Sequence, residues 1–107
     1  LTARKALYNL ATWVHTRQPQ RPTDRDDAAG LYRRAIASDL SNVEAMYNLA
    51  TLLMNQASAY NADNSEATQL LEAAIKTRPS YTRAGELLKN LKSWQAKRAK
   101  KEAAATK

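Results

Sequence analysis

Apolar residues recur at steps of three and four positions along most of the chain, which places them on one side of an α-helix. Two such stripes come first and consist of Ala3, Ala6, Leu7, Leu10 and Val14, then Ala28, Leu31, Tyr32, Ala35 and Ile36. Two more follow, formed by Met46, Leu49, Ala50 and Leu53, then Ala67, Leu70, Leu71, Ala74 and Ile75. We therefore predict an all-α fold with five helices, over residues 3–17, 24–38, 42–57, 65–77 and 81–104.

Residues that begin or end helices lie between these stripes. Two prolines separate the first stripe from the second, where each removes an amide donor and restricts the residue before it. Thr23 precedes a run of aspartates and predicts a capped helix start with negative charge at the positive end of the helix dipole. Ser41 followed by Glu44 predicts a capping box, in which the Ser41 hydroxyl accepts from the Glu44 amide.

The chain contains an internal repeat. The segment Tyr-Asn-Leu-Ala-Thr occurs at residues 8–12 and again at 47–51, an offset of 39 residues. The same offset aligns the alanines, leucines and isoleucines of the second stripe with those of the fourth. Self-similarity at such a period is typical of helical repeat proteins. We divide the chain into a repeat domain over 1–92, with repeats 3–41 and 42–80 and a capping helix from 81, and a basic C-terminal extension over 93–107.

The repeat resembles the tetratricopeptide family, whose signature joins a large-Leu-small first helix to an Ala-large-Ala second helix and a terminal proline. The second copy holds these places with Met46, Leu49, Ala50, Leu53, Ala67, Leu71, Ala74 and Pro79. The first copy holds them with Leu7, Leu10, Ala11, Val14, Ala28, Tyr32, Ala35 and Leu40. The period of 39 exceeds the family's 34, and aliphatic residues replace most family aromatics. The resemblance implies an α-α superhelix, a solenoid of about five antiparallel helices with longer turns.

The resemblance also implies a concave surface lined by successive first helices, which holds a peptide or a partner helix. The matching positions here are Lys5, Tyr8, Asn9, Thr12 and His15, then Glu44, Tyr47, Asn48, Thr51 and Asn55, then Arg83, Glu86 and Asn90. In one interpretation the repeated Tyr-Asn pair binds the partner, because an amide can bridge backbone groups while a ring covers an apolar side chain. In the other, the tyrosines pack and the asparagines bond locally.

Some tetratricopeptide proteins clamp a C-terminal carboxylate between the first helices. Asn48 and Arg83 fit that pattern, whereas Tyr8, Thr12 and Leu87 stand where lysine, asparagine and a basic residue are needed. We therefore do not expect recognition of a chaperone tail.

Charge is concentrated at the C-terminal end. The net charge is +7, and residues 82–107 carry eight basic and two acidic side chains. The candidate cations of the extension are Lys92, Lys97, Arg98, Lys100 and Lys101. Such a cluster can neutralise phosphates of nucleic acid or an anionic membrane surface. The alternative is a solvated helix end, where cations favour the helix dipole in any case.

Composition excludes several kinds of chemistry. There are no cysteines, one histidine and two glycines, which leaves no disulfides, no thiolate zinc site and no glycine-rich phosphate loop. No acid–base pair or nucleophile constellation is visible, so we expect neither an enzyme nor a cofactor. No apolar run reaches the roughly 20 residues that cross a bilayer. Without cysteine or an Asn-x-Ser/Thr acceptor, the sequence favours an intracellular, cytoplasmic protein.

Together these features predict a non-catalytic protein–protein interaction module, a scaffold, adaptor or assembly subunit within a larger complex. One alternative is a subunit that attaches to a ribonucleoprotein or an anionic surface through its basic extension. Another is a mitochondrial import receptor of the plant type, which is similar in having few repeats and extended turns.

Two packing expectations follow from the repeat. Leu87, Leu88 and Leu91 should face inward and cover the second helix pair, and Trp13, which stands where the second copy has Leu52, should fill helix packing. No helix of the repeat precedes the first one, so we expect a longer chain or a bound partner to protect its outer side.

Overall fold

The computed structural model describes residues 3–18, 20–54 and 65–105. Within these ranges it contains no strand and five α-helices: α1 (Ala3–Thr16), α2 (Asp24–Ser38), α3 (Val43–Met54), α4 (Ser65–Thr77) and α5 (Thr82–Ala105). The predicted all-α fold is confirmed, and the helix ends agree with the prediction to within three residues wherever both are described. The predicted end of the third helix, at 55–57, lies outside the described residues, as does Asn55.

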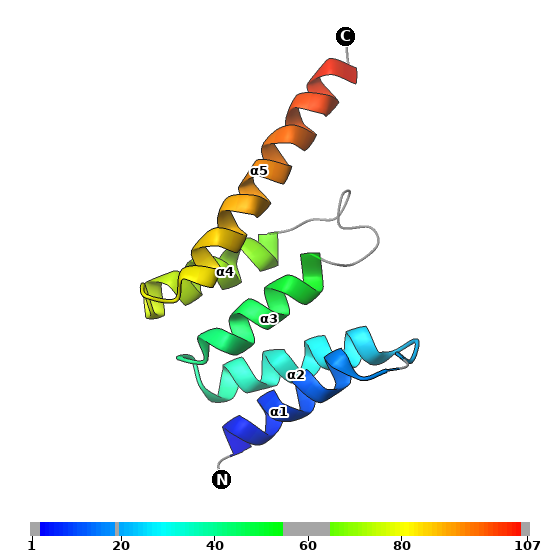
Figure 1. Cartoon of the computed structure of the whole chain (residues 1–107), viewed down its shortest axis with the longest axis vertical. Helices are drawn as coiled ribbons and strands as arrows, with labels where there is room; N and C mark the ends of the chain where they lie inside the picture. The colour runs from blue at the N-terminus through cyan, green and yellow to red at the C-terminus, as the bar shows by residue number, and fades with distance from the viewer. Residues whose placement is uncertain (1–2, 19, 55–64, 106–107) are drawn as a thin grey trace.

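The helices form an elongated stack with dimensions of 57 × 35 × 19 Å. Helices α1 and α2 make one hairpin, α3 and α4 make the next, and α5 crosses α4 at the end (Figure 1). Each helix packs mainly on its neighbours in the sequence, which is the pattern of an all-α helical repeat. With 24 residues against 13 in α4, α5 continues well beyond the stack (Figure 1).

Two apolar clusters form a continuous core along the stack. The first joins α1, α2 and the near side of α3, and consists of Ala11, Val14, Ala28, Ala29, Tyr32, Ala35, Ala45, Leu49 and Leu52. The second joins the far side of α3 to α4 and α5, and consists of Val43, Met46, Ala50, Met54, Ala67, Leu71, Ala74, Ala84, Leu88 and Leu91. Alanines at the helix contacts allow close approach, while leucine, methionine and the Tyr32 ring fill the remaining space.

The start of α5 covers the second hairpin as expected. Leu88 and Leu91 are buried against α3 and α4, and Leu87 is half-buried against the same cluster. Beyond Leu91 every described side chain of α5 is exposed except that of Arg98, which is half-buried. The helix therefore has a packed first half and a projecting second half.

An ion pair closes the turn between α1 and α2. The guanidinium of Arg17 donates two hydrogen bonds to Asp24, one of them 2.9 Å from Nε to Oδ2, and the Arg21 amide donates a third at 2.7 Å. The Asp24 side chain is completely buried. Its bond to Arg17 is the main cause that lowers its pKa to about 2, against the opposing effect of burial. The Gln20 amide closes the same turn by donating to the carbonyls of Val14, His15 and Arg17.

Both predicted caps are wrong in detail. The Ser41 amide and hydroxyl donate to the carboxylate of Asp39, so Asn42 caps α3 instead, with Oδ1 accepting from the Ala45 amide at 3.0 Å. Glu44 does not return to Ser41, because its carboxylate binds Arg78. At the start of α2, Thr23 forms no side-chain cap, and the buried Asp24 binds the turn instead. In each case a neighbouring residue forms the local side-chain bond and takes a different donor: Asn42 takes the Ala45 amide and Asp24 takes the Arg21 amide.

The prediction for Trp13 is also wrong. Its side chain is 57% exposed, and the Arg17 guanidinium lies 4.8 Å from the ring centroid. The stripe residue Leu10 is likewise 47% exposed, although its repeat equivalent Leu49 is fully buried. The cause is position in the stack: α2 lies over Leu49, and no described helix lies over Leu10.

We predict that Asp24→Asn lowers the melting temperature and flattens the acid side of the stability profile. The folded-state pKa of Asp24 lies below its ordinary 3.8, so the carboxylate stabilises the fold above about pH 4 and loses this contribution as the pH falls toward 2. Circular dichroism melts between pH 2 and 7 measure both effects. Glu72→Gln, which changes an exposed carboxylate of α4, is the control. Equal pH profiles for the wild type and Asp24→Asn would contradict a stabilising role of the Arg17–Asp24 ion pair, which we call the Arg17–Asp24 clasp.

The repeat offers a matched pair of truncations. Leu49→Ala empties a fully buried position and should lower the free energy of unfolding by about 2–5 kcal/mol. Leu10→Ala removes the same atoms from the equivalent but exposed position and should lower it by less than about 1 kcal/mol. Urea titrations at low protein concentration compare the two variants. Equal losses would mean that Leu10 is as well covered as Leu49.

Candidate partner-binding surface

The predicted binding residues lie on α1, α3 and the first turns of α5, and we call this surface the groove surface. Its described members are Lys5, Tyr8, Asn9, Thr12, His15, Glu44, Tyr47, Asn48, Thr51, Arg83, Glu86 and Asn90. Neither tyrosine of the repeated pair is fully buried: Tyr8 and Tyr47 are both half-buried. Each ring therefore packs on one side and leaves part of its surface open.

One Tyr-Asn pair connects the two repeats. The amide of Asn48 on α3 donates to the Tyr8 hydroxyl on α1 at 3.1 Å. The next copy lacks this bond, because the residue 39 positions after Asn48 is Leu87. Equivalent residues of the two copies therefore have different roles. Asn48 and Tyr8 hold neighbouring helices together, whereas the Asn9 amide and the Tyr47 hydroxyl make no hydrogen bond with the residues that the structure describes.

A second polar network lies beneath α1. The Tyr32 hydroxyl, which comes from α2, shares a hydrogen bond of 3.0 Å with His15 Nδ1 and lies 3.4 Å from Thr12 Oγ1. The His15 ring meets the Tyr32 ring edge-on, with 5.8 Å between their centroids. The centroid of the Tyr8 ring lies 6.2 Å from that of Tyr32. Burial raises the pKa of Tyr32. His15 is thus a partner of a buried tyrosine rather than a free groove residue.

The two threonines of the repeat bond to their own helices. Thr12 Oγ1 donates to the Tyr8 carbonyl at 3.0 Å, and Thr51 Oγ1 donates to the Tyr47 carbonyl at 2.9 Å. Each hydroxyl hydrogen is therefore already used, and a ligand could approach these residues only as a hydrogen-bond donor.

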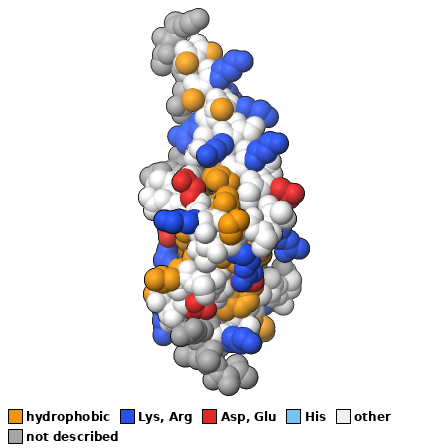
Figure 2. Space-filling model, turned by 90° about the vertical axis from the view of Figure 1, so that its left-hand side faces the viewer, with side chains coloured by type: hydrophobic (Ala, Val, Ile, Leu, Met, Phe, Trp, Pro, Cys, Tyr) orange, Lys and Arg blue, Asp and Glu red, His pale blue; other side chains and the backbone are white. Residues whose placement is uncertain are grey.

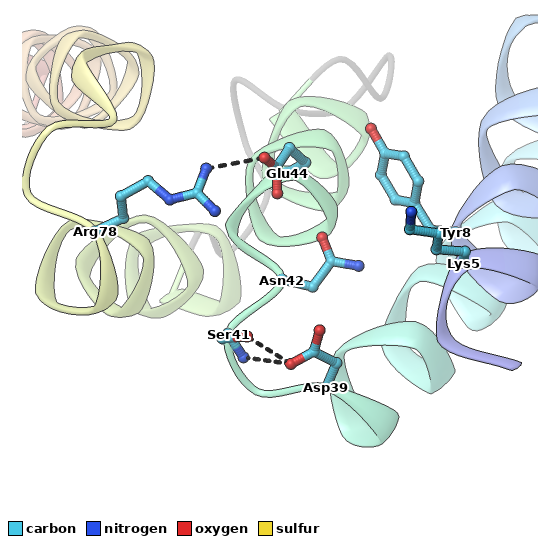
Figure 3. Close-up of a pocket in the computed structure, with 7 residues that line it drawn as sticks. All are labelled: Lys5, Tyr8, Asp39, Ser41, Asn42, Glu44 and Arg78. Atoms are coloured by element: carbon cyan, nitrogen blue, oxygen red, sulfur yellow. Dashed lines mark hydrogen bonds and ion pairs between the residues drawn. The ribbon is translucent and has the colours of Figure 1, made fainter. Parts of the chain in front are cut away.

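A cleft of about 390 Å³ opens at the end of the groove surface where the turns between hairpins lie. One wall is α1, with Lys5 and Tyr8; the other combines Asp39, Ser41 and Asn42 of the α2–α3 turn with Glu44 and Arg78 (Figure 3). Arg78 Nη1 donates to Glu44 Oε1 at 2.9 Å, and this pair closes the wall opposite α1. On the α1 wall, the Lys5 side chain is exposed and forms no salt bridge with the described residues.

Tyr81, which the sequence analysis missed, connects the turn after α4 to the groove surface. Its ring meets the Tyr47 ring edge-on at 5.8 Å, and the Arg78 guanidinium lies 5.9 Å from its centroid. Burial raises the pKa of Tyr81, as does the neighbouring Glu44 carboxylate, while Arg83 opposes them. The repeat register contained a signal: Tyr81 stands 39 residues after Asn42, which lines the cleft.

The remaining predicted residues lie apart from the cleft. Glu86 and Asn90 are exposed on α5, and Arg83, which is exposed as well, lies near Tyr81 and opposes the rise in the pKa of that tyrosine. The basic residues of the extension are elsewhere again, distributed along the projecting half of α5 (Figure 2). They are Lys92, Lys97, Arg98, Lys100 and Lys101. The structure therefore separates two candidate surfaces, one polar and aromatic, the other basic.

Comparisons with known proteins add no family assignment: no protein-family model matches the chain, and no curated protein matches it. Among the described helices, none combines the length and the apolar character needed to cross a membrane. In the same part of the chain, no three His, Cys, Asp or Glu side chains gather as metal ligands would.

We predict that His15 titrates below its usual pKa of 6.5. Burial is the main cause, because it disfavours the imidazolium, and the nearby Arg25 adds repulsion. The unfolded chain therefore binds the proton more readily, so the free energy of unfolding decreases as the pH falls below about 6.5. An NMR titration of the imidazole measures the pKa. Arg25→Gln should raise it toward 6.5, and Lys97→Gln, on the projecting half of α5, should leave it unchanged.

Proposed function

We propose that this chain is a non-catalytic protein–protein interaction module of the tetratricopeptide type, whose groove surface holds an extended peptide. The cleft between α1 and the α3–α4 hairpin supports this proposal most directly. Its lining combines residues of the first repeat with Asn42, Glu44 and Arg78 of the second, and the Asn48–Tyr8 hydrogen bond connects the two repeats. A ligand in the cleft would therefore meet a surface that is already organised.

The available groups favour a peptide with an acidic and an apolar side chain. The Lys5 ammonium can pair with a carboxylate, because no described residue neutralises it. The Asn9 amide and the Tyr47 hydroxyl can bond the peptide backbone. The edge-to-face pair of Tyr47 and Tyr81 offers ring surface for an apolar side chain. These groups lie on neighbouring helices, which suits an extended segment rather than a compact ligand.

The chemistry of the surface also favours binding over catalysis. His15, the sole histidine of the chain, is occupied by its bond to Tyr32. Glu44 is bound to Arg78, and both threonine hydroxyls donate to backbone carbonyls. The histidine, Glu44 and the two threonines therefore already have structural partners, and the groups left over, which include the Asn9 amide, the Tyr47 hydroxyl and the Lys5 ammonium, are suited to recognition.

Selection of peptides on the full chain tests this proposal. We expect a random peptide library displayed on phage to yield acidic-apolar sequences that bind the wild type. Asn9→Ala and Tyr47→Phe each remove one hydrogen bond without truncating a core side chain, so each should weaken binding of the selected peptide roughly 5–10-fold. Fluorescence anisotropy with a labelled peptide gives the affinities.

Gln69→Ala is the matched control, because Gln69 is an exposed amide on α4, away from the groove surface. It should leave the affinity unchanged. If Asn9→Ala and Tyr47→Phe bind as tightly as the wild type, or if Gln69→Ala weakens binding equally, the groove surface is not the binding site.

A second candidate function is attachment to nucleic acid through α5, and the projecting half of that helix favours it. Lys92, Lys97 and Lys100 are all exposed there, at steps of five and three residues. At about 100° per residue these three lie within an arc of about 140°, and together with Arg98 and Lys101 the five cations span about 240° around the helix axis. A charge arranged in this way suits a polyanion that can wrap the helix, such as single-stranded RNA, better than a flat membrane.

The salt dependence of RNA binding tests this second function. For the wild type we expect log K for a single-stranded RNA to fall with log salt concentration at a slope of about −0.7 per phosphate contacted. Replacing Lys92, Lys97 and Lys100 together by Gln should reduce the slope by about 2. A matched triple variant of the stack, with Arg25, Arg34 and Lys76 changed to Gln, should keep it. Equal slopes for both triple variants would contradict a specific role of α5.

A further inference from the structure

The two repeats differ in what covers the outer side of their first helix. In the second repeat, Ala45, Leu49 and Leu52 of α3 are buried in the cluster that α2 forms over them. The equivalent residues of α1, 39 positions earlier, are Ala6, Leu10 and Trp13, and all three are exposed. The side chains thus keep the apolar character of a helix contact at a place where the described chain supplies no helix.

A hollow of about 470 Å³ marks the same place, between α1 and α2. Four of its α2 residues are Asp27, Gly30, Leu31 and Arg34. The residues 39 positions later on α4, namely Glu66, Gln69, Leu70 and Ala73, line a corresponding hollow, and its other wall includes Ile36 of α2 and Leu40 of the turn after α2. In the second repeat α2 therefore forms one wall of the hollow, which has a volume of about 400 Å³, whereas no described helix forms that wall in the first repeat.

Gly30 is not explained by packing within the chain. It lies inside α2, where glycine destabilises a helix relative to alanine. A Cβ atom added there would meet nothing within 4 Å. A glycine in this position does allow the backbone of another helix to approach closely.

The charges of the second repeat indicate what such a helix should carry. Across the contact between α2 and α4, Arg33 binds Glu66 with two hydrogen bonds, 2.9 and 2.8 Å long. Asp27 is the repeat equivalent of Glu66 and forms no salt bridge with the described residues. By analogy, a helix that covers α1 and α2 should bring a cation to Asp27.

The other end of the stack cannot supply that helix. On α3, Met46 and Ala50 are buried where they face the following helix α4. At the equivalent positions α5 has Gly85 and Lys89, both exposed, and Lys92 follows on the same side. Copies of this chain therefore cannot stack head to tail, because lysines of α5 would have to enter an apolar contact.

We propose that a second copy of this chain docks on the α1–α2 face, related to the first by a twofold axis. On α2, Asp27 and Arg34 lie seven residues, about 10.5 Å, apart on one face with Gly30 between them. When two such helices cross in opposite directions near Gly30, Asp27 of each copy faces Arg34 of the other. Leu10, Trp13 and Leu31 of both copies are then covered. This self-complementary pattern is what an isologous dimer requires. The α1–α2 face is separate from the groove surface, so the proposal does not depend on the proposed function.

Charge exchange across the axis tests the proposal with the full chain. Sedimentation velocity from about 1 to about 300 µM should show a concentration-dependent monomer–dimer equilibrium for the wild type. Arg34→Glu alone and Asp27→Arg alone should each weaken the dimer at least about tenfold, because each places like charges opposite one another twice. An equimolar mixture of the two variants should dimerise like the wild type, since both contacts then join opposite charges. Circular dichroism checks that each variant folds.

Apolar substitutions provide a second, independent readout. Leu10→Asp should abolish the dimer, whereas Leu40→Asp, which changes an exposed leucine in the turn between α2 and α3, should leave it intact. A wild type that remains monomeric at all concentrations would overturn the proposal and assign the face to another helix. A dimer that survives Leu10→Asp, or a variant mixture that does not recover, would overturn it as well.

Discussion

Burial of α3 on two sides holds this molecule together. Ala45, Leu49 and Leu52 pack toward the first hairpin, while Met46 and Ala50 pack toward α4 and α5. Neither hairpin alone could bury both sides of α3, because two packed helices bury only the sides that face each other. The third face of α3 is the only one left for recognition, and it carries Glu44, Tyr47, Asn48 and Thr51. The position of the groove surface thus follows from the packing of α3.

Helices α1 and α5 use the same repeat positions under different constraints. α5 packs on one hairpin only. Leu88 and Leu91 are buried on the side that faces this hairpin, and exposed lysines occupy the positions where α3 contacts its following helix. α1 has α2 behind it but keeps Leu10 and Trp13 exposed on its outer side. A polar terminal face keeps a solenoid from extending further, and here only the C-terminal end has one. The stack is therefore chemically asymmetric from end to end.

The sequence was sufficient to predict the helices, the repeat and the inward direction of Leu88 and Leu91, because helical periodicity is a local property. It could not distinguish Leu10 from Leu49, which occupy identical motifs and differ only in what lies above them. It also could not show which aspartate near α2 is buried, since Asp24, Asp26 and Asp27 are equally suited to a helix start. The Asn48–Tyr8 bond escaped prediction for a similar reason: it depends on the register between repeats, 40 residues apart.

Helix α1 has no described helix over its outer stripe, which consists of Ala6, Leu10 and Trp13. Its inner side packs on α2, and its links to the rest of the stack include the Arg17–Asp24 clasp and the Asn48–Tyr8 hydrogen bond. The Arg17 guanidinium also lies over one face of the Trp13 ring, yet Trp13 stays 57% exposed and Leu10 47% exposed, so the two polar links hold α1 in place without burying its outer side. Any molecule bound to the groove surface or to the outer stripe would bind the folded form of α1 selectively and so stabilise it.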